Sequence, residues 1–261
     1  MKTGKMYIDD FQRISALFFY EKSCCHINLL IPYDQFNKYK KNFMSNAKDA
    51  YGRILKAIIT SELKPGEPVA EIQVAERFGF GRTPVREAIK RLENEGFIAS
   101  SEHKKRVYIL FPKDIDEIFT LKQAIESMVS AKAAALAKPQ DKKDLIKLLG
   151  EINALKVDAN NERFVQKWLD MDVRFHRLLF KMAQNVRAEN IIDNLNLQFR
   201  RIKLGMMVLE GRVEKAIEEH SEIGKAVVAG DSEAASRLMY DHLEKVKHTI
   251  ISLMETFYYT P

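Results

Sequence analysis

The chain has little cysteine, with only Cys24 and Cys25 in 261 residues. Two cysteines cannot build a disulfide framework, and an adjacent pair fits neither the spacing of a zinc knuckle nor that of a redox-active CxxC. The chain also lacks an apolar run long enough to cross a membrane and any segment that resembles a signal peptide. These absences exclude disulfide-rich secreted proteins and membrane-spanning proteins, and we expect a cytoplasmic protein with two free thiols.

Charge is distributed unevenly along the sequence. The formal net charge is +6, of which residues 1–43 and residues 44–112 each hold +3, while residues 113–261 are balanced. A positive excess in the first part indicates a polyanionic partner there. The neutral second part is typical of a region that binds a small molecule or another protein. The length allows one or two domains.

The segment from residue 79 to residue 98 carries the most informative pattern. Gly79 and Gly81 end one helix, Thr83 is a favourable N-cap, and Pro84 suits the first helical position. Apolar residues then recur at helical spacing and predict a buried stripe, made of Val85, Ala88, Ile89 and Leu92. Four cations lie off this stripe, namely Arg82, Arg86, Lys90 and Arg91.

A helix start that carries arginines suits a DNA groove. Free N–H groups and the helix dipole attract phosphate, and Arg86 can donate two hydrogen bonds to a guanine edge. The alternative is an ordinary surface helix with a solvated basic face. The flanking segments favour DNA binding, because helices are expected over residues 50–60 and 71–78, with a turn at residues 64–66.

A hairpin is expected after this helix. Residues 97–100 and 107–111 are β-prone and flank a basic stretch at residues 102–106, which we place at the hairpin tip. Three helices and a hairpin make a winged helix-turn-helix. The expected fold is therefore mostly α, with a winged helix-turn-helix DNA-binding domain over residues 44–112 and an all-α helical bundle over residues 113–261.

These residues resemble the GntR family of bacterial transcription regulators. The matching pieces are Leu63-x-Pro65-Gly66, Glu71-x-x-x-Ala75 and Arg82-Thr83-Pro84-Val85-Arg86-Glu87-Ala88, followed by Gly96. The resemblance implies that Arg82 and Arg86 touch bases or phosphates, that Thr83 contacts a backbone phosphate, and that the wing reaches the minor groove.

Two positions depart from the pattern of that family. Gly81 replaces the usual Ser or Thr, and Lys104 stands where the family usually has a glycine at the wing tip. Lys104, Lys105 and Arg106 are expected to hold phosphates by charge, which raises affinity and salt dependence without specifying sequence.

Residues 1–43 show no such resemblance. Members of the family commonly begin a few residues before the first helix, which corresponds here to Met44-Ser45-Asn46. One hypothesis is that residues 1–43 come from an upstream start codon and are disordered or absent in the cell. The other is an arm that packs on the body of the protein.

Beyond Pro112 the pattern changes to long helices without strands. We expect helices over residues 113–137, 141–158, 162–184, 189–209, 213–229 and 233–257. This bundle resembles the ligand-sensing FCD domain of the FadR subgroup of GntR regulators. The matching pieces are Ile118-x-x-Leu121-Lys122-x-x-Ile125-Glu126, Asp172-x-x-Phe175-His176-x-x-Leu179, Glu219-His220, Gly230-Asp231-x-x-Ala234-Ala235 and His242-Leu243.

Four residues of the bundle are candidate metal ligands. Asp172 and His176 are four residues apart, so both project from one face of a helix, while His220 and His242 belong to separate helices. Histidines that only hydrogen-bond in a core are the alternative. The FCD resemblance implies a divalent ion such as zinc, nickel or manganese, which one carboxylate and three imidazoles suit. His26, His103 and His248 are not assigned to the metal.

An octahedral ion with four protein ligands keeps open positions for the carboxylate of an effector. Arg200 or Arg201 is a candidate for the other end of a small organic acid, although a solvated helix face explains each arginine equally well. Family members usually have arginine where this chain has Lys122, and lysine cannot form the planar fork. Lys122 is thus a third candidate, with a structural role as its alternative.

The sequence predicts a transcriptional regulator, a repressor by preference and not an enzyme, that binds operator DNA as a homodimer and responds to a small carboxylate. A metal-dependent hydrolase is the competing class. It requires a general base near the metal. Glu219 and Asp170 flank the candidate ligands in sequence, but neighbouring residues on a helix point about 100° apart, so neither is placed to act as that base. A third possibility is a regulator whose metal is purely structural and which has no effector.

Overall fold

The computed structural model describes residues 46–101, 104–158, 161–206, 209 and 211–259. The hypotheses about residues 1–43, together with His26 and His103, lie outside this part. The chain divides into two compact units, of which the second comprises Phe111–Glu255. Each unit is described separately below.

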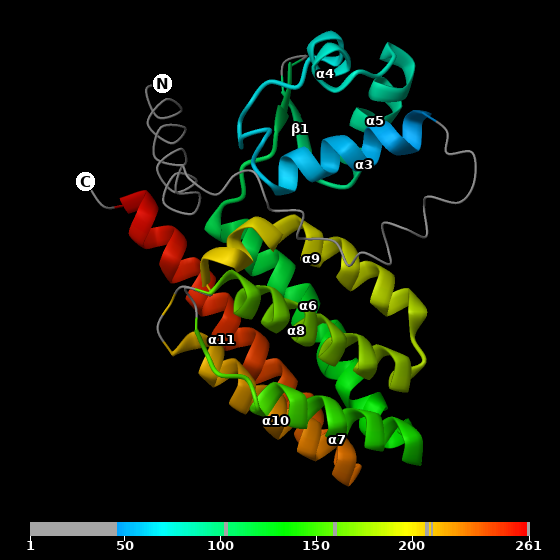
Figure 1. Cartoon of the computed structure of the whole chain (residues 1–261), viewed down its shortest axis with the longest axis vertical. Coiled ribbons are helices and arrows are strands. Elements are labelled where there is room, and N and C mark those ends of the chain that lie inside the picture. The colour runs from blue at the N-terminus through cyan, green and yellow to red at the C-terminus, as the bar shows by residue number, and fades with distance from the viewer. Residues whose placement is uncertain (1–45, 102–103, 159–160, 207–208, 210, 260–261) are drawn as a thin grey trace. The chain divides into compact units, whose positions relative to one another are not determined.

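Over the described residues 46–101 and 104–110, the first unit has three helices and a two-stranded sheet, which Figure 1 shows. Its helices are α3 (Asn46–Ile59), α4 (Glu71–Phe78) and α5 (Arg82–Asn94), and both α3 and α4 pack against α5. The expected stripe on α5 is buried as predicted. It meets side chains of α3 and the following turn in a core whose largest fully buried members are Ile54, Ile58, Leu63, Ile89 and Leu92.

Helix α5 starts two residues earlier than expected. Gly81 is the N-cap, in an extended conformation and without a side-chain hydrogen bond, so Arg82 is the first helical residue. The expectation that Thr83 caps the helix and that Pro84 takes its first position is therefore wrong. Pro84 still lies in the first turn, where its missing N–H leaves no backbone acceptor without a donor. As a result, the Thr83 side chain is not used for capping.

The wing is formed by β1 (Ile98–Ser101) and β2 (Lys104–Val107), which pair antiparallel with Ser101 opposite Lys104. The second strand was expected over residues 107–111, and this is wrong. The segment before α4 explains this shift, because it forms hydrogen bonds with β2. The Val69 N–H donates to the Lys105 carbonyl, and the Val107 N–H donates to the Glu67 carbonyl. All three cations expected at the tip therefore lie within the paired strand β2, with Lys104 as its first residue and Lys105 and Arg106 further along it.

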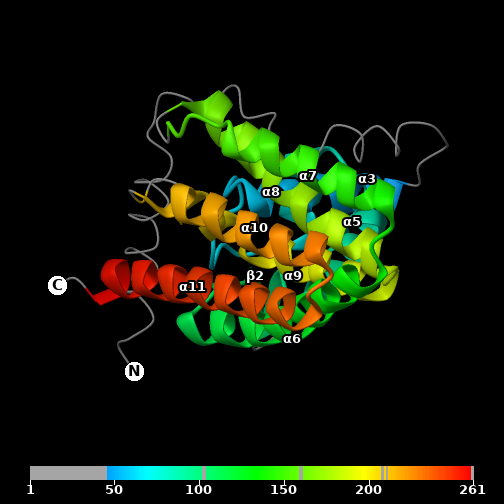
Figure 2. The same ribbon diagram turned by 90° about the horizontal axis from the view of Figure 1, so that it is seen from below.

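The second unit is a helical bundle, in which the described residues form six helices. They are α6 (Pro112–Leu136), α7 (Pro139–Asn153), α8 (Glu162–Ala183), α9 (Val186–Met206), α10 (Arg212–Ala229) and α11 (Ser232–Tyr259). Helix α6 contacts α8, α9 and α10, while α7 contacts α8 and α10. Helix α11 lies beside α6 and α10 (Figure 2). This confirms an all-α bundle with six helices at the expected places.

Local signals set the ends of these helices. The Asn161 side chain accepts hydrogen bonds from the N–H groups of Arg163 and Phe164 and so caps α8. Gly230 ends α10 in the left-handed conformation at φ 80°, which glycine adopts without strain. Within the described residues, no helix is long and apolar enough to cross a membrane.

Candidate metal centre and nucleic-acid interface

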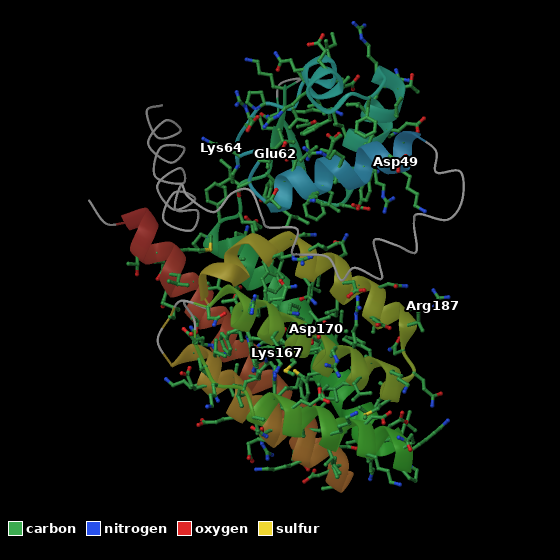
Figure 3. The ribbon with its side chains drawn as sticks, in the orientation of Figure 1. Asp49, Glu62, Lys64, Lys167, Asp170 and Arg187 are labelled. Carbon is green, nitrogen blue, oxygen red and sulfur yellow. The ribbon has the colours of Figure 1, made fainter. Side chains whose placement is uncertain are left out.

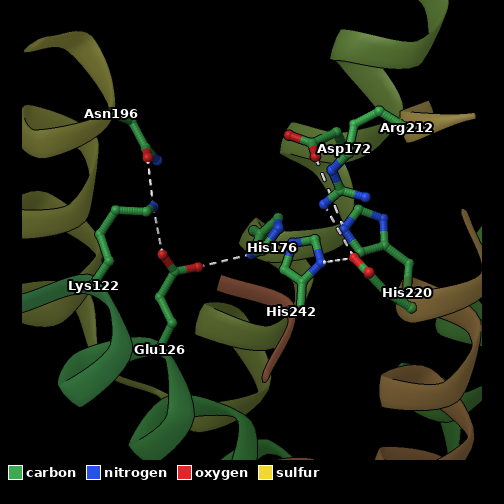
Figure 4. Close-up of polar contacts among 9 residues, drawn as sticks. Lys122, Glu126, Asp172, His176, Asn196, Arg212, His220 and His242 are labelled. Carbon is green, nitrogen blue, oxygen red and sulfur yellow. Dashed lines mark hydrogen bonds and ion pairs between the residues drawn. The ribbon is translucent and has the colours of Figure 1, made fainter. Parts of the chain in front are cut away.

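Three histidines from three helices converge inside the bundle (Figure 4). His176 lies on α8, His220 on α10 and His242 on α11. One ring nitrogen from each lies within 4.8 Å of the others. His220 and His242 are buried, and His176 is partly buried. The bundle thus brings together the three histidines that the sequence pointed to.

Asp172 completes the expected set of four. It lies one turn before His176 on α8, and its Oδ1 is 3.9 Å from Nε2 of His220. The carboxylate is buried, with 7 % of the residue exposed. A carboxylate and three imidazoles therefore occupy one small, largely buried volume.

Aromatic rings hold His220 in place. Its ring stacks on Phe175 with the centroids 4.3 Å apart, and Trp168 stacks on it at 5.6 Å. Both interplanar angles are 19°. Phe175 and Trp168 are themselves buried, so the orientation of this imidazole is fixed by packing.

His176 is supported by a buried ion pair on α6. Its Nδ1 lies 2.7 Å from Oε2 of Glu126, whose other oxygen is 2.6 Å from Nζ of Lys122. Burial opposes ionisation of Glu126, but the Lys122 ammonium and His176 outweigh it and hold the pKa of this carboxyl well below its usual range. Lys122 also donates a 2.6 Å hydrogen bond to Oδ1 of Asn196 on α9.

His242 has a corresponding carboxylate. Its Nδ1 is 2.6 Å from Oε2 of Glu219, which also pairs with Arg212 at 3.2 Å. Burial lowers the pKa of His242, although the contact with Glu219 works against this. Glu219 therefore reaches a candidate ligand on a neighbouring helix, which its position next to His220 in the sequence did not indicate. The carboxylate sits at the Nδ1 side of that ring.

This geometry fits a divalent metal. In both His176 and His242, Nδ1 is occupied by a carboxylate, which leaves Nε2 as the nitrogen for an ion. A metal bonded at about 2.0–2.1 Å to each nitrogen spans at most about 4.2 Å between two of them. The three ring nitrogens lie within 4.8 Å of one another, which is close to that span. The residues that would hold the ion are Asp172, His176, His220 and His242.

The three candidate effector residues occupy different surroundings. Lys122 is 4 % exposed and is engaged with Glu126 and Asn196. Arg200 lies on α9, and burial lowers its pKa to about 10. Among the described residues it has no hydrogen bond or ion pair. The side chain of Arg201 lies outside the described part.

Two residues that were not expected to take part in the metal site lie away from the three histidines. His248 is exposed and pairs with Glu244 at 3.0 Å on the same helix. Asp170 is exposed on α8 and lies 3.8 Å from Arg174 (Figure 3). Neither residue contributes to the group of converging histidines.

The start of α5 presents polar side chains to solvent. Arg82, Thr83, Arg86 and Lys90 are exposed, and within the described ranges none of them has a hydrogen bond or ion pair. Arg91 is different, because it pairs with Glu95 at 2.8 Å and stacks over the ring of Tyr51 at 3.8 Å. The first turns of α5 therefore offer cations that are free to bind an anion.

The cations of the wing have distinct partners. Lys104 is exposed at the start of β2 and has no partner in the described part of the chain. Lys105 pairs with Glu93 at 2.9 Å, and Arg106 donates to the Gly66 carbonyl at 2.9 Å. Only Lys104 of these three is available without breaking a contact.

Family models match both units. The one described as "Bacterial regulatory proteins, gntR family" covers residues 46–109, and the one described as "FCD domain" covers residues 117–245. The chain belongs to the GntR family. This GntR regulator therefore carries a helix-turn-helix domain followed by an FCD domain.

Relatives of the regulator support this assignment. It is 30 % identical over 192 residues to the "Probable D-xylose utilization operon transcriptional repressor" of Paenarthrobacter nicotinovorans, with 73 % of this chain and 82 % of that protein covered. It is 25 % identical over 205 residues to the HTH-type transcriptional regulator YdhC of Bacillus subtilis (strain 168), with coverages of 77 % and 90 %. The structure of E. coli McbR/YncC shares its fold, with a TM-score of 0.61 at 18 % identity and coverages of 81 % and 99 %.

Sequence reasoning missed two carboxylates of this GntR regulator, Glu126 and Glu219. The four-residue spacing of Lys122 and Glu126 is visible in the sequence and suggests an ion pair. Nothing local connects Glu126 with His176, fifty positions later, or Glu219 with His242 on another helix. These contacts arise only from helix packing.

Proposed function

We propose that this transcriptional regulator is a repressor whose FCD domain binds a divalent metal and a small organic acid, and that the acid controls operator binding. The observation that carries the proposal is the convergence of His176, His220 and His242 beside Asp172. Zinc, nickel and manganese suit this set of donors. When bound, the ion supplies a Lewis acid with open positions for a carboxylate.

The effector requires a second cation for its other end. Arg200 supports this role, because it is partly buried and has no partner among the described residues. A buried cation without a partner gains most from an incoming carboxylate. Arg201 on the same helix is the second candidate. Lys122 is the weakest of the three, since Glu126 already neutralises it.

DNA recognition is assigned to the first unit. Arg82 and Arg86 are proposed to touch bases or phosphates, and Thr83 is proposed to contact a backbone phosphate. Lys104 and, after release from Glu93, Lys105 are proposed to hold phosphates through the wing. The exposure of Arg82, Thr83 and Arg86 on α5 and of Lys104 on β2 supports these roles, whereas Lys105 is half-buried.

A homodimer follows from the small size of the DNA-binding unit. One helix-turn-helix buries too little surface for tight, specific binding, so two copies read half-sites about one helical turn apart. The operator is then a short pseudo-palindrome, which the protein binds in the cytoplasm. Effector binding shifts the population between two placements of the DNA-binding units, of which one matches the half-site spacing.

A panel of small carboxylic acids tests the proposal. The melting temperature of the metal-loaded protein is measured with each acid, with His220→Ala in parallel. A stabilising acid that the variant no longer recognises supports a metal-dependent sensor. If no acid acts although the metal itself stabilises the protein, the metal is structural and there is no effector of this class.

Operator binding completes the test. Asp172→Ala is expected to keep nearly the wild-type affinity for DNA and to lose the response to the acid. An acid response that persists in Asp172→Ala contradicts the assignment of this carboxylate to the metal.

A further inference from the structure

A continuous series of buried and partly buried contacts joins α9 to the histidine cluster through α6 (Figure 4). Asn196 accepts a hydrogen bond from Lys122, Lys122 pairs with Glu126, and Glu126 contacts Nδ1 of His176, with distances of 2.6, 2.6 and 2.7 Å. Four residues therefore connect three helices, ending at a candidate metal ligand.

The charges in this series are almost completely removed from water. Lys122 is 4 % exposed and Glu126 is 2 % exposed. Burying an ion pair is costly, and apolar residues of similar volume often give equal or greater stability. A buried pair that also contacts a candidate ligand therefore points to a role beyond holding the fold together.

The chemistry of the carboxylate defines that role. One oxygen of Glu126 lies 2.6 Å from the Lys122 ammonium and the other lies 2.7 Å from Nδ1 of His176, so the carboxylate is placed as an acceptor between two nitrogen atoms. When the Nδ1 atom that faces this carboxylate carries the ring proton, Nε2 of His176 keeps its lone pair for a metal. An acceptor at Nδ1 also fixes the ring orientation and makes the ligand more basic.

We propose that Glu126 is a positioning residue for the metal and that Lys122 and Asn196 couple occupancy of the metal to α9. The inference rests on the proposed metal centre. It gives Lys122 a different task from effector binding, since the ammonium holds Glu126 in place. Helix α9 also carries Arg200, one turn after Asn196, so the helix with the candidate effector residue is the one that responds to the metal.

The only tryptophan of the chain provides the measurement. Trp168 stacks on His220 at 5.6 Å, so Ni²⁺ bound at the cluster quenches its fluorescence. Ni²⁺ is titrated into the metal-free full-length protein. We expect saturable quenching in the wild type and an affinity lower by about 10–100-fold in Glu126→Gln.

Glu244→Gln is the matched control for this variant. Glu244 accepts a hydrogen bond from Gln123 between α11 and α6, but it contacts none of the four candidate ligands. The Glu244→Gln variant is expected to bind Ni²⁺ as the wild type does. If circular dichroism shows that Glu126→Gln does not fold, Glu126→Asp keeps the charge beside Lys122 while withdrawing it from His176, and it is expected to show the same loss.

The outcomes separate the two proposals. Equal Ni²⁺ affinity in the wild type and the folded Glu126 variant overturns the positioning role and leaves the metal centre standing. A wild type without saturable quenching removes the metal centre, and the positioning role with it.

Hydrogen exchange tests the coupling to α9. We expect Ni²⁺ to slow amide exchange in α9 of the wild type and to lose this effect in Asn196→Ala, which still binds the ion. Asn194→Ala is the control, because Asn194 lies on the same helix and bonds only to Gln198 within it. Metal-dependent protection that survives Asn196→Ala overturns the coupling.

Discussion

Glu219 contacts His242 at 2.6 Å, so the residue directly before one candidate ligand supports another candidate ligand on a different helix. The two carboxylates Glu126 and Glu219 thus approach the cluster from α6 and α10 and occupy Nδ1 of separate histidines. Such supports orient ligands before an ion arrives, and their removal commonly weakens metal affinity about 10–100-fold.

Glu219→Gln should therefore weaken metal binding by that factor, because the neutral amide no longer favours the Nδ1–H form of His242. The measurement is a competition titration of zinc against a chromophoric chelator. Glu218→Gln is the matched control, since Glu218 is the exposed neighbour on the same helix. Equal losses in both variants contradict a specific support of His242.

Removing the metal should lower the melting temperature of the wild type. An ion present at about 100 times its Kd contributes about 2.7 kcal/mol to the folded state, provided that it does not bind the unfolded chain. Calorimetry with and without a chelator measures this difference. The chelator is expected to have no effect on His220→Ala and its usual effect on His248→Ala, because His248 lies outside the cluster.

Arg86→Ala should cost about 1–3 kcal/mol of binding free energy and relax the preference at one base position. The operator is first selected from a random pool of DNA duplexes, and single-base variants are then compared by fluorescence anisotropy. Arg91→Ala is the control on the same helix, because its guanidinium is held by Glu95 and Tyr51. An unchanged base preference in Arg86→Ala contradicts the proposed recognition helix.

Lys104→Ala should weaken binding to all DNA sequences alike and reduce the salt slope by about one. Lys105→Ala should have a smaller effect, because Lys105 already pairs with Glu93 and must exchange that partner for a phosphate. Binding constants measured across a range of salt concentrations give both slopes. Equal slopes for Lys104→Ala and the wild type indicate that the wing does not reach the DNA backbone.

Much of the first unit could be predicted from local sequence. The stripe of Val85, Ala88, Ile89 and Leu92 on α5 follows from helical periodicity, and the structure buries all four. The wing could not be placed correctly, because the position of β2 depends on hydrogen bonds with Glu67 and Val69, about 40 residues earlier. A strand is fixed by its partner, whereas a helix satisfies its own backbone.

The candidate metal site could also be predicted only in part from the sequence. Spacing placed Asp172 and His176 on one helix face, and the FCD resemblance added His220 and His242. The carboxylates behind these ligands could not be inferred from spacing, because Glu126 reaches His176 from a helix fifty residues away. Lys122 likewise gained its partner Asn196 only through the packing of α6 on α9.

The sequence by itself therefore determined the helices of both units, the basic start of α5 and the identity of the candidate ligands. The helices and the basic start of α5 follow from hydrogen bonds and side-chain periodicity within short segments, whereas the resemblance to the FCD domain supplied His220 and His242. Only the tertiary structure decided which ring nitrogens face a carboxylate and which cations stay free. Those features depend on side chains from helices far apart in sequence, which packing brings within 3 Å of one another.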